Sequence, residues 1–412
     1  MKHVIILADG LADHRIERLG DLTPVEFAST PAMDFLAREG VNGQVVTIPD
    51  GFQPGSEVAN STILGYDQNK VYEGRGVLEA ASIGYDVADD EMAMRCNLLT
   101  IDADGNIANH HGGHLTTDEG RQLIDYLNEK LGSERVKFVA GIQYRHLLII
   151  KGGSKYVECA PPHDHPGRSA KELMVKPMAG AVDEPGRMTA AETAALLNQL
   201  IEQSGQLLAE HPVNVARRSE GRLQASHIWP WSPGYRPAMK TLSQMFPQIK
   251  SGAVISAVDL IKGIGRLAGL EVIEVEGATG LANTNYEGKA AAAIDALRRH
   301  DFVFLHVEAT DEAGHDGDLD LKVKAIEYLD HRVVAPIIDA VKAMDEKVTI
   351  ALLPDHATPV EERVHRAEPV PVAIWHPGIV ADDVSAYSEL ASSRGSLGMI
   401  YLTDFIKRLM AF

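Results

Sequence analysis

The stretch FVFLHVEATDEAGHDG, residues 302–317, carries the pattern that decides the fold. It opens with a mostly apolar segment, residues 302–307, as expected for a parallel strand that is covered on both faces. Asp311 and His315 follow this run at helical spacing, which is also the spacing of a solvated surface pair. Carboxylate oxygen and imidazole nitrogen are ligands that suit Mn, Zn or Mg. The stretch therefore predicts a strand that leads to candidate metal ligands.

The same arrangement recurs near both ends of the chain. Residues 4–8 form an apolar run that ends at Asp9, and residues 348–353 form another that ends at Asp355 and His356. Each alone has an ordinary explanation, an Asp-Gly turn in the first case and a helix N-cap in the second. Sites in open α/β sheets lie outside the carboxyl ends of the strands, so residues far apart in sequence can converge there. Taken together, the three endings predict a metal centre.

Strand and helix patterns alternate through the remainder of the N-terminal and C-terminal parts. This alternation predicts an α/β domain with one mixed, mainly parallel sheet between helix layers. Further strands are expected at residues 43–48, 252–256, 271–275 and 370–375, and helices at 31–39, 261–267, 289–300 and 321–342.

The middle of the chain has a different character, with hairpin-like strands and two helices. We interpret residues 92–221 as an inserted α+β cap domain that binds substrate, and residues 1–91 with 222–412 as the catalytic, metal-binding domain. Within the insertion, strands are expected at residues 94–102, 137–140 and 147–151, and helices at 117–131 and 190–210.

Composition narrows the classes of partner. The chain has 412 residues, 45% of them apolar, and a formal net charge of −19, which disfavours nucleic acid and anionic lipid as partners. No apolar stretch approaches the ~20 residues of a membrane span. Cys96 and Cys159 form no metal or redox motif, and the first ten residues are too short for a signal peptide, so we expect a cytoplasmic protein. A phosphate ester would require local positive charge, which bound metal ions would supply.

A candidate nucleophile lies in PGSEVAN, residues 54–60. Gly55 permits a tight turn, and a helix is expected to begin at Ser56. Serine is a favoured N-cap, which is the ordinary explanation, but Ala59 is not the Glu or Gln of a capping box. A serine at a helix N-terminus beside a metal could attack phosphorus, with backbone N–H groups receiving the phosphate oxygens.

The chain resembles the cofactor-independent phosphoglycerate mutases, in the archaeal-type branch of that family within the alkaline phosphatase superfamily. The resemblance covers nearly the whole chain and implies an alkaline-phosphatase-like fold. The matching stretches, in order, are ILADGLAD, PGSEVANSTILGYD, YEGRGVLEA, MRCNLLTID, YRHLLII, HPVN, KGIGRLAGL, GATG, HVEATDEAGHDGDLDLK, PDHATP and HRAEPVPVAIW.

The resemblance implies two divalent cations, Mn²⁺ before Mg²⁺, Zn²⁺ or Co²⁺. Ser56 would carry the phosphoryl group as a phosphoserine, and Lys262, otherwise a surface or C-capping lysine, would contact that group. One cation would be held by Asp9, Ser56, Asp355 and His356. The other would be held by Asp311, His315 and His365.

The cap keeps some of the family's arginines and departs from the family elsewhere. Arg75, Arg95 and Arg145 are present and would bind substrate. Two other stretches, where the family tends to have arginine, instead read HHGGH at residues 110–114 and IWPWSPG at residues 228–234. Histidine and tryptophan lack the bidentate fork of arginine, so the catalytic half looks intact and the substrate-selecting half altered.

The histidine stretch allows three interpretations. His111 and His114 could handle substrate, which is the role we assign them, or lie in an exposed loop, or form a zinc site with His163 and His165. Trp229 and Trp231, in the second stretch, are either core residues or stacking platforms.

The leading hypothesis is interconversion of 3-phosphoglycerate and 2-phosphoglycerate, with a small phosphorylated substrate as the ligand; the chain could also form a homo-oligomer. The family also contains a bacterial subgroup proposed to phosphorylate homoserine, so a homoserine kinase-like phosphotransferase is an alternative. A phosphomonoester hydrolase and a non-enzymatic metal-binding protein are further alternatives. No Gly-x-x-x-x-Gly-Lys-Ser/Thr loop is present for a nucleotide donor.

Overall fold

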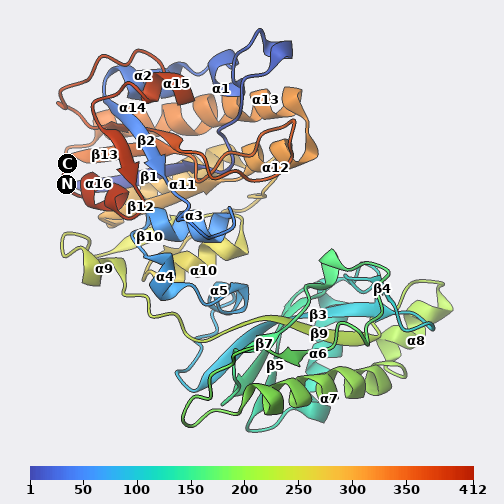
Figure 1. Cartoon of the computed structure of the whole chain (residues 1–412). Coiled ribbons are helices and arrows are strands. Elements are labelled where there is room, and N and C mark those ends of the chain that lie inside the picture. The colour runs from blue at the N-terminus through green and yellow to red at the C-terminus, as the bar shows by residue number, and fades with distance from the viewer. The chain divides into compact units, whose positions relative to one another are not determined.

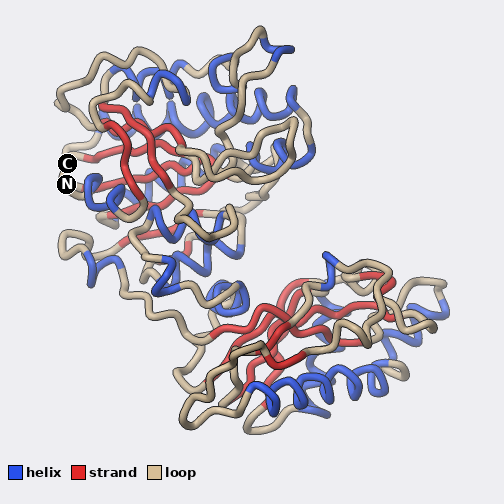
Figure 2. The backbone as a smooth tube through the Cα atoms, viewed as in Figure 1, coloured by secondary structure: helices blue, strands red, loops and turns tan.

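The computed structural model describes all 412 residues and divides into two compact units. Unit 1 comprises residues 1–72 and 238–412, and unit 2 comprises residues 73–237. Each unit is built around its own sheet, with helices packed on it (Figures 1 and 2). The prediction of a mainly parallel α/β domain with an inserted α+β domain is confirmed.

The sheet of unit 1 has eight strands, and β1 lies between β12 and β13, parallel to both. Ala8 of β1 is opposite Val307 of β12, and Leu7 is opposite Leu353 of β13, so the three carboxyl ends reach the same edge. β14 runs antiparallel to its neighbours β13 and β2. In spatial order the strands are β11 (Glu271–Val272), β10 (Gly252–Ile255), β12 (Phe302–Val307), β1 (Lys2–Ala8), β13 (Val348–Leu353), β14 (Val370–Trp375), β2 (Val41–Val46) and β15 (Gly398–Tyr401).

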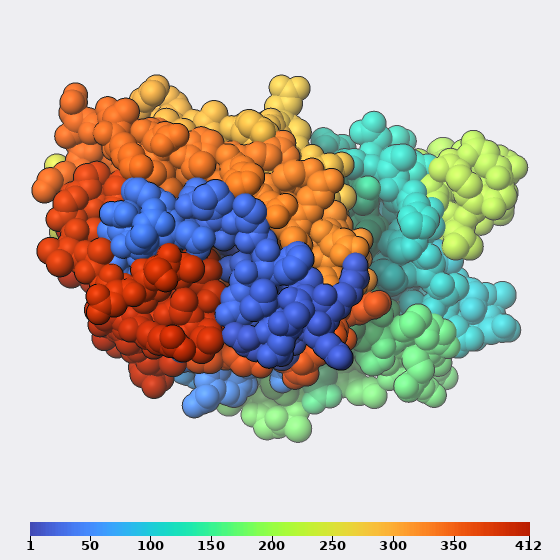
Figure 3. All heavy atoms as spheres, turned by 90° about the horizontal axis from the view of Figure 1, so that it is seen from above, coloured from blue at the N-terminus to red at the C-terminus, as the bar shows by residue number.

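The three central strands are buried along their whole length, because helices cover both faces of the sheet. Segments from both ends of the chain lie against each other on one face of this unit (Figure 3). No helix in the structure combines the length and apolar character needed to cross a bilayer. The helices of unit 1 are α1 (Pro24–Phe27), α2 (Pro31–Arg38), α3 (Ser56–Ile63), α4 (Gln68–Val71), α9 (Leu242–Met245), α10 (Asp259–Leu267), α11 (Tyr286–Arg299), α12 (Ala309–Asp316), α13 (Leu319–Leu329), α14 (Ala335–Ala343), α15 (Glu389–Ser392) and α16 (Asp404–Leu409).

The single helix predicted over residues 321–342 is interrupted. A π-helical turn, Asp330–Val334, separates α13 from α14. The buried carboxylate of Asp330 accepts hydrogen bonds from the N–H groups of Ala32 (3.2 Å) and Met33 (2.7 Å) at the start of α2. The N-cap residue of α2 makes no side-chain bond of its own, so this carboxylate satisfies the free N–H groups of a neighbouring helix.

Unit 2 is an antiparallel sheet with helices on both faces. Met92 and Met94 of β3 face one core, under α6 and α7, whereas Ala93 faces a smaller cluster under α5, as the two-residue period of a strand requires. The strands are β3 (Glu91–Ile101), β4 (Ile107–Asn109), β5 (Val136–Ile142), β6 (Arg145–Lys151), β9 (His227–Gly234) and a separate pair, β7 (Val157–Glu158) with β8 (Lys176–Pro177). The helices are α5 (Arg75–Ser82), α6 (Thr117–Leu131), α7 (Ala190–Leu208) and α8 (Pro212–Ser219).

The units divide the chain at 72/73 and 237/238, outside the boundaries at 91/92 and 221/222 placed from the sequence. On the N-terminal side the reason is α5, whose Val77 and Ala80 pack against Ala93 of β3 and Leu147 of β6. On the C-terminal side the reason is β9, which pairs with β3.

Strand β9 was not predicted because it contains Pro230 and Pro233 and ends at Gly234. Proline removes a ladder hydrogen bond and is confined to edge strands and bulges; the ladder between β9 and β3 has a register shift. Trp229 and Trp231 of this strand are buried in the core of unit 2, and their indole N–H groups donate to protein oxygens. The burial of the two tryptophans therefore supports the interpretation that they are core residues.

A buried histidine makes unit 2 sensitive to acid. His146 of β6 accepts a hydrogen bond from the N–H of Gly141 and packs so closely against Gly120 of α6 that a Cβ there would lie 3.1 Å from its ring. Burial lowers the pKa of His146 to about 3, against 6.5 ordinarily. The unfolded chain therefore binds the extra proton below pH 6.5, and stability is lost as the pH falls from 6.5 towards 3.

We expect His146 to cost unit 2 about 2 kcal/mol between pH 7 and pH 5. Urea unfolding at both pH values measures this loss, followed by the fluorescence of Trp229 and Trp231 in a Trp375→Phe background, because Trp375 belongs to unit 1. His146→Leu should flatten the pH dependence, whatever it does to stability at pH 7. An unchanged difference between the two pH values in the variant would contradict the assignment.

Candidate functional site

The candidate ligands gather at the edge of the sheet where β1, β12 and β13 end. Their ligand atoms form two groups of three, and within each group the atoms lie within 4.8 Å of one another. His356 belongs to both groups, which therefore share an imidazole. The first group is Asp9, Asp355 and His356, and the second is Asp311, His356 and His365.

Ser56 is the first residue of α3 and lies beside the first group. Its Oγ is 3.2 Å from Nε2 of His356, and the N-cap residue of α3, Gly55, makes no side-chain capping bond. Asn60, one turn later, donates to the carbonyl of Ser56 (2.8 Å) and to Oδ2 of Asp355 (2.9 Å). The start of α3 is therefore fastened to a candidate ligand.

Hydrogen bonds orient the histidines. Nδ1 of His315 lies 3.0 Å from the carbonyl oxygen of Arg363; because a carbonyl only accepts, Nδ1 carries the proton and the other nitrogen, Nε2, faces Asp311 at 3.3 Å. Nδ1 of His356 lies 3.3 Å from the hydroxyl of Thr358. Metal-binding histidines characteristically use their second nitrogen in this way.

The cluster is rich in buried negative charge. Asp9 is 1% exposed; its Oδ2 lies 2.8 Å from Nε2 of His306, and its Oδ1 has no hydrogen-bond partner. Burial, together with the charges of Asp355 and Asp311, raises the pKa of Asp9 well above its ordinary value. Burial and neighbouring acidic groups raise the pKa of Glu308 to about 8. A buried carboxylate oxygen without a partner is costly, and a bound cation would satisfy it.

Asp311 stays ionised in the same surroundings. Burial opposes its charge, but hydrogen bonds with His315 and His365 outweigh burial and hold its pKa far below the ordinary value. The hydrogen bond with Asp311 in turn raises the pKa of His315 to about 9. The set thus offers ionised oxygen and imidazole nitrogen, a combination that fits Mn²⁺, Zn²⁺ or Mg²⁺.

The structure brings all seven predicted ligands into one neighbourhood. His365 Nε2 lies 3.4 Å from Oδ1 of Asp311 and 2.8 Å from Nε2 of His315. His315 and Ser56 lie beside the two converging groups, and their assignment as ligands remains a prediction.

Three residues that the sequence did not single out support this cluster: His306, Asn60 and Thr358. Asn60 follows Ser56 by four residues, so helical spacing could have placed it on the same face. His306 is a histidine inside an apolar strand, where a buried imidazole needs a partner. Thr358, whose hydroxyl donates to Asp311, gives no signal in the sequence.

Lys262 lies on α10, which packs against α3. Its ammonium is 2.8 Å from the carboxylate of Glu274 and 3.9 Å from that of Asp259. The structure therefore pairs Lys262 with acidic side chains, and a contact with the phosphoryl group remains a prediction.

The three arginines predicted to bind substrate lie in unit 2. Arg95 forms an ion pair with Glu79 (2.9 Å), and its guanidinium lies 4.3 Å from the ring centre of Trp231. Burial lowers the pKa of Arg95, and the charges of Arg75 and Arg145 lower it further. These three cations therefore share one region of the unit.

The predicted substrate histidines occupy an ordered turn of unit 2. The rings of His111 and His114 lie 4.0 Å apart, and the N–H of His114 donates to Nδ1 of His111. Asn109 accepts hydrogen bonds from the N–H groups of His111 and Gly113. Neither histidine belongs to the two groups of converging ligand atoms.

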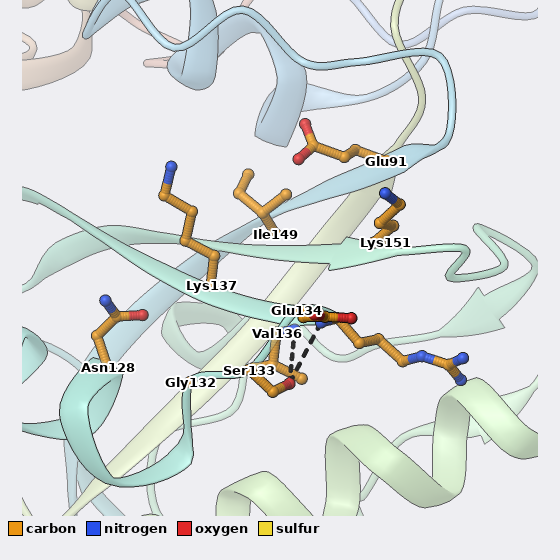
Figure 4. A pocket seen from close by; sticks show the side chains of 10 residues that line it. Glu91, Asn128, Gly132, Ser133, Glu134, Val136, Lys137, Ile149 and Lys151 are labelled. Carbon is orange, nitrogen blue, oxygen red and sulfur yellow. Dashed lines mark hydrogen bonds between the residues drawn. The ribbon is translucent and has the colours of Figure 1, made fainter.

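A hollow of about 300 Å³ lies elsewhere in unit 2, at the end of α6 (Figure 4). Its lining contains no histidine or cysteine. Ser133 accepts hydrogen bonds there from the N–H groups of Arg135 and Val136, and Glu91 bonds the hydroxyl of Tyr85. Ser133 and Glu91 are engaged locally, and Glu134 is the only other carboxylate, so this hollow lacks the converging carboxylate and imidazole groups found at the edge of the unit 1 sheet.

Comparison with known proteins identifies relatives over the whole chain. A protein of Methanosarcina acetivorans named 2,3-bisphosphoglycerate-independent phosphoglycerate mutase is 45% identical over 412 residues, covering 100% of both chains. A protein of Geobacter sulfurreducens with the name "probable 2,3-bisphosphoglycerate-independent phosphoglycerate mutase" is 40% identical and covers 100% of this chain and 98% of its own.

Solved structures give the same picture. A Pyrococcus horikoshii protein matches with a TM-score of 0.81 at 32% identity, covering 100% of this chain and 97% of its own. The cofactor-independent phosphoglycerate mutase of Thermoplasma acidophilum matches with a TM-score of 0.72 at 26% identity, covering 100% and 99%. The family model described as 2,3-bisphosphoglycerate-independent phosphoglycerate mutase matches residues 37–214. The chain therefore belongs to the family of 2,3-bisphosphoglycerate-independent phosphoglycerate mutases.

Proposed function

We propose that this protein interconverts 3-phosphoglycerate and 2-phosphoglycerate by passing the phosphoryl group to Ser56 and back. The observation that carries the proposal is the position of the Ser56 hydroxyl, 3.2 Å from His356 at the edge of a buried carboxylate and imidazole cluster. The names of relatives that are 45% identical along the whole chain support the choice of substrate.

Two divalent cations complete the proposed site, with Mn²⁺ the first choice. When bound, they would neutralise the charge of the phosphoryl oxygens and favour ionisation of the serine hydroxyl. Asp9, Ser56, Asp355 and His356 would hold one cation. Asp311, His315 and His365 would hold the other.

The side chains and backbone around Ser56 have separate roles in this proposal. The hydroxyl of Ser56 is held by His356, and Asn60 fixes the start of α3. The N-terminal end of α3, whose N-cap residue has no side chain that competes there, would favour the negative phosphoryl oxygens through the helix dipole. Lys262 would exchange its present acidic partners for the phosphoryl group.

Unit 2 would select the substrate. Arginine recognises carboxylate and phosphate through paired N–H donors. We assign this role to the arginines whose charges act on one another in unit 2, and a supporting polar role to the ordered histidine turn. The residues are Arg75, Arg95, Arg145, His111 and His114.

A substrate panel with purified, Mn²⁺-loaded protein tests the proposed function. We expect conversion of 3-phosphoglycerate to 2-phosphoglycerate, followed by phosphorus NMR, with kcat in the ordinary range of about 1–10³ s⁻¹. Homoserine with ATP should give no phosphohomoserine, and free phosphate should form more slowly than the isomerised product.

The other outcomes point to different enzymes. Phosphohomoserine formed without any mutase turnover would contradict the proposal in favour of a kinase-like phosphotransferase. Free phosphate formed faster than 2-phosphoglycerate would instead indicate a phosphomonoester hydrolase.

A further inference from the structure

A lysine buried in unit 1 lies close to the candidate ligands. Lys322 of α13 has a side chain with no exposed surface. Its ammonium is 2.8 Å from Oδ2 of Asp13, 2.7 Å from the carbonyl oxygen of Thr358 and 3.5 Å from that of Ala12. All three partners are oxygens, so each of the three hydrogens of the ammonium has an acceptor.

The carboxylate of Asp13 extends these contacts. It accepts a hydrogen bond from the N–H of Val360 (3.1 Å) through Oδ2 and from the N–H of His14 (2.8 Å) through Oδ1. The N–H of Asp13 donates to Oε1 of Glu389 (3.1 Å). Asp13 therefore connects Lys322 to both the loop after β1 and the loop after β13.

These loops and the helix before α13 are the segments that carry the candidate ligands. The loop after β1 contains Asp9, the loop after β13 contains Asp355 and His356, and α12, which packs against α13, contains Asp311. Thr358 joins all three, because its N–H donates to Ala12, its carbonyl accepts from Lys322 and its hydroxyl donates to Asp311. Lys322 thus lies at the point where the three ligand-bearing segments meet.

We propose that Lys322 and Asp13 form an internal ion pair that positions Asp311 and His356 to bind a divalent cation. The inference rests on the proposed function insofar as that function requires cations at this site. Replacing a buried ion pair by apolar side chains is often neutral or stabilising, so stability alone does not account for a charged pair here. The contacts of the pair with the ligand-bearing loops indicate instead that it holds these loops in position.

The sign of the effect separates positioning from simple electrostatics. The ammonium of Lys322, paired with Asp13, also interacts electrostatically with Asp311. Through charge alone, removing the ammonium would strengthen cation binding, because like charges repel. If the ammonium acts by holding the loops in place, its removal weakens cation binding, and losses of about 10–100-fold follow when a residue that orients a metal ligand is removed.

Mn²⁺ titration of the purified full-length protein, by calorimetry and by electron paramagnetic resonance, tests the proposal. The variants are Lys322→Met, Asp13→Asn and the double variant, which removes both charges together. We expect the affinity of at least one of two Mn²⁺ sites to fall about 10–100-fold in each. The double variant should keep this loss even where it recovers thermal stability, since no unpaired charge remains buried.

Lys2→Met is the matched control. Lys2 is a buried lysine at the opposite end of β1, where its ammonium donates to the carbonyl of Leu297 (2.7 Å) and pairs with Glu346 (2.7 Å). This variant loses similar contacts in the same unit but touches no ligand-bearing loop. We expect it to bind Mn²⁺ with the affinity of the unaltered protein.

The outcomes distinguish the inference from the proposed function. Unaltered protein that binds no Mn²⁺ contradicts the two-cation site itself. Unaltered protein that binds two Mn²⁺, with equal or higher affinity in Asp13→Asn and the double variant, overturns the positioning role. The double variant removes one positive and one negative charge, so its net charge is unchanged and a loss of affinity there reflects positioning; it decides the question even if Lys322→Met does not fold.

Discussion

Ser56→Ala is expected to lower kcat for phosphoglycerate isomerisation by at least about 10⁴-fold, as removal of a nucleophile does in other enzymes. In the proposed reaction the phosphoryl group leaves the substrate for Oγ of Ser56, and alanine offers no atom to receive it. The loss should appear in kcat rather than in KM, because the variant leaves the residues assigned to substrate binding unchanged.

Ser61→Ala is the control for this variant. Ser61 lies in the same helix, is buried and is replaced by the same residue, so it reproduces the cost of the substitution without removing the proposed nucleophile. Intact-protein mass spectrometry after quenching with acid should find a phosphate adduct on the unaltered protein and on Ser61→Ala, located at Ser56, and none on Ser56→Ala. Ser56→Ala protein with the same rate as Ser61→Ala would contradict the phosphoserine route.

The core of unit 1 could be predicted from its sequence because a strand that is buried on both faces is apolar along its whole length, a pattern that is easily recognised. Strand β12 occupies Phe302–Val307, as predicted, since every side chain along it must be apolar or paired. The polar residues that follow such a strand have to lie at the sheet edge. For that reason Asp9, Asp311 and Asp355 could be expected to meet before any contact between them was known.

What the sequence could not predict depends on partners that are remote in the chain. Lys322 and Asp13 are 309 residues apart, and nothing near either one indicates that the two charges are buried together. In the same way, α5 belongs to unit 2 because Val77 packs against Ala93 of β3 and Leu147 of β6. Strand β9 could not be predicted because it contains prolines, which are tolerated at a sheet edge and not in a sheet centre. In each case a tertiary contact overrides the local pattern.

Removing divalent cations is expected to abolish activity and to destabilise unit 1 by about 5 kcal/mol, if two cations are each present at 100 times their Kd. Asp9, Asp311 and Asp355 lie together with almost no exposure, and one oxygen of Asp9 has no partner. In the absence of cations, hydrogen bonds with His315 and His365 keep Asp311 ionised, whereas burial and the neighbouring carboxylates favour protonation of Asp9 and raise its pKa. Cations bind the folded arrangement and not the unfolded chain, so their binding energy adds to the stability of the fold.

Thermal unfolding before and after treatment with a chelator measures this contribution, and we expect a fall of roughly 10–20 °C in the Tm of unit 1. Hydrogen exchange shows which strands the bound cations stabilise. Backbone protection should fall in β1, β12 and β13, whose ends carry the ligands, and should not change in β6 of unit 2, which serves as an internal control. Adding Mn²⁺ should restore protection and mutase activity together. Equal loss in both units, or none in either, would contradict a cation site at this edge of the sheet, because only the strands that lead into the ligands are tied to the bound charge.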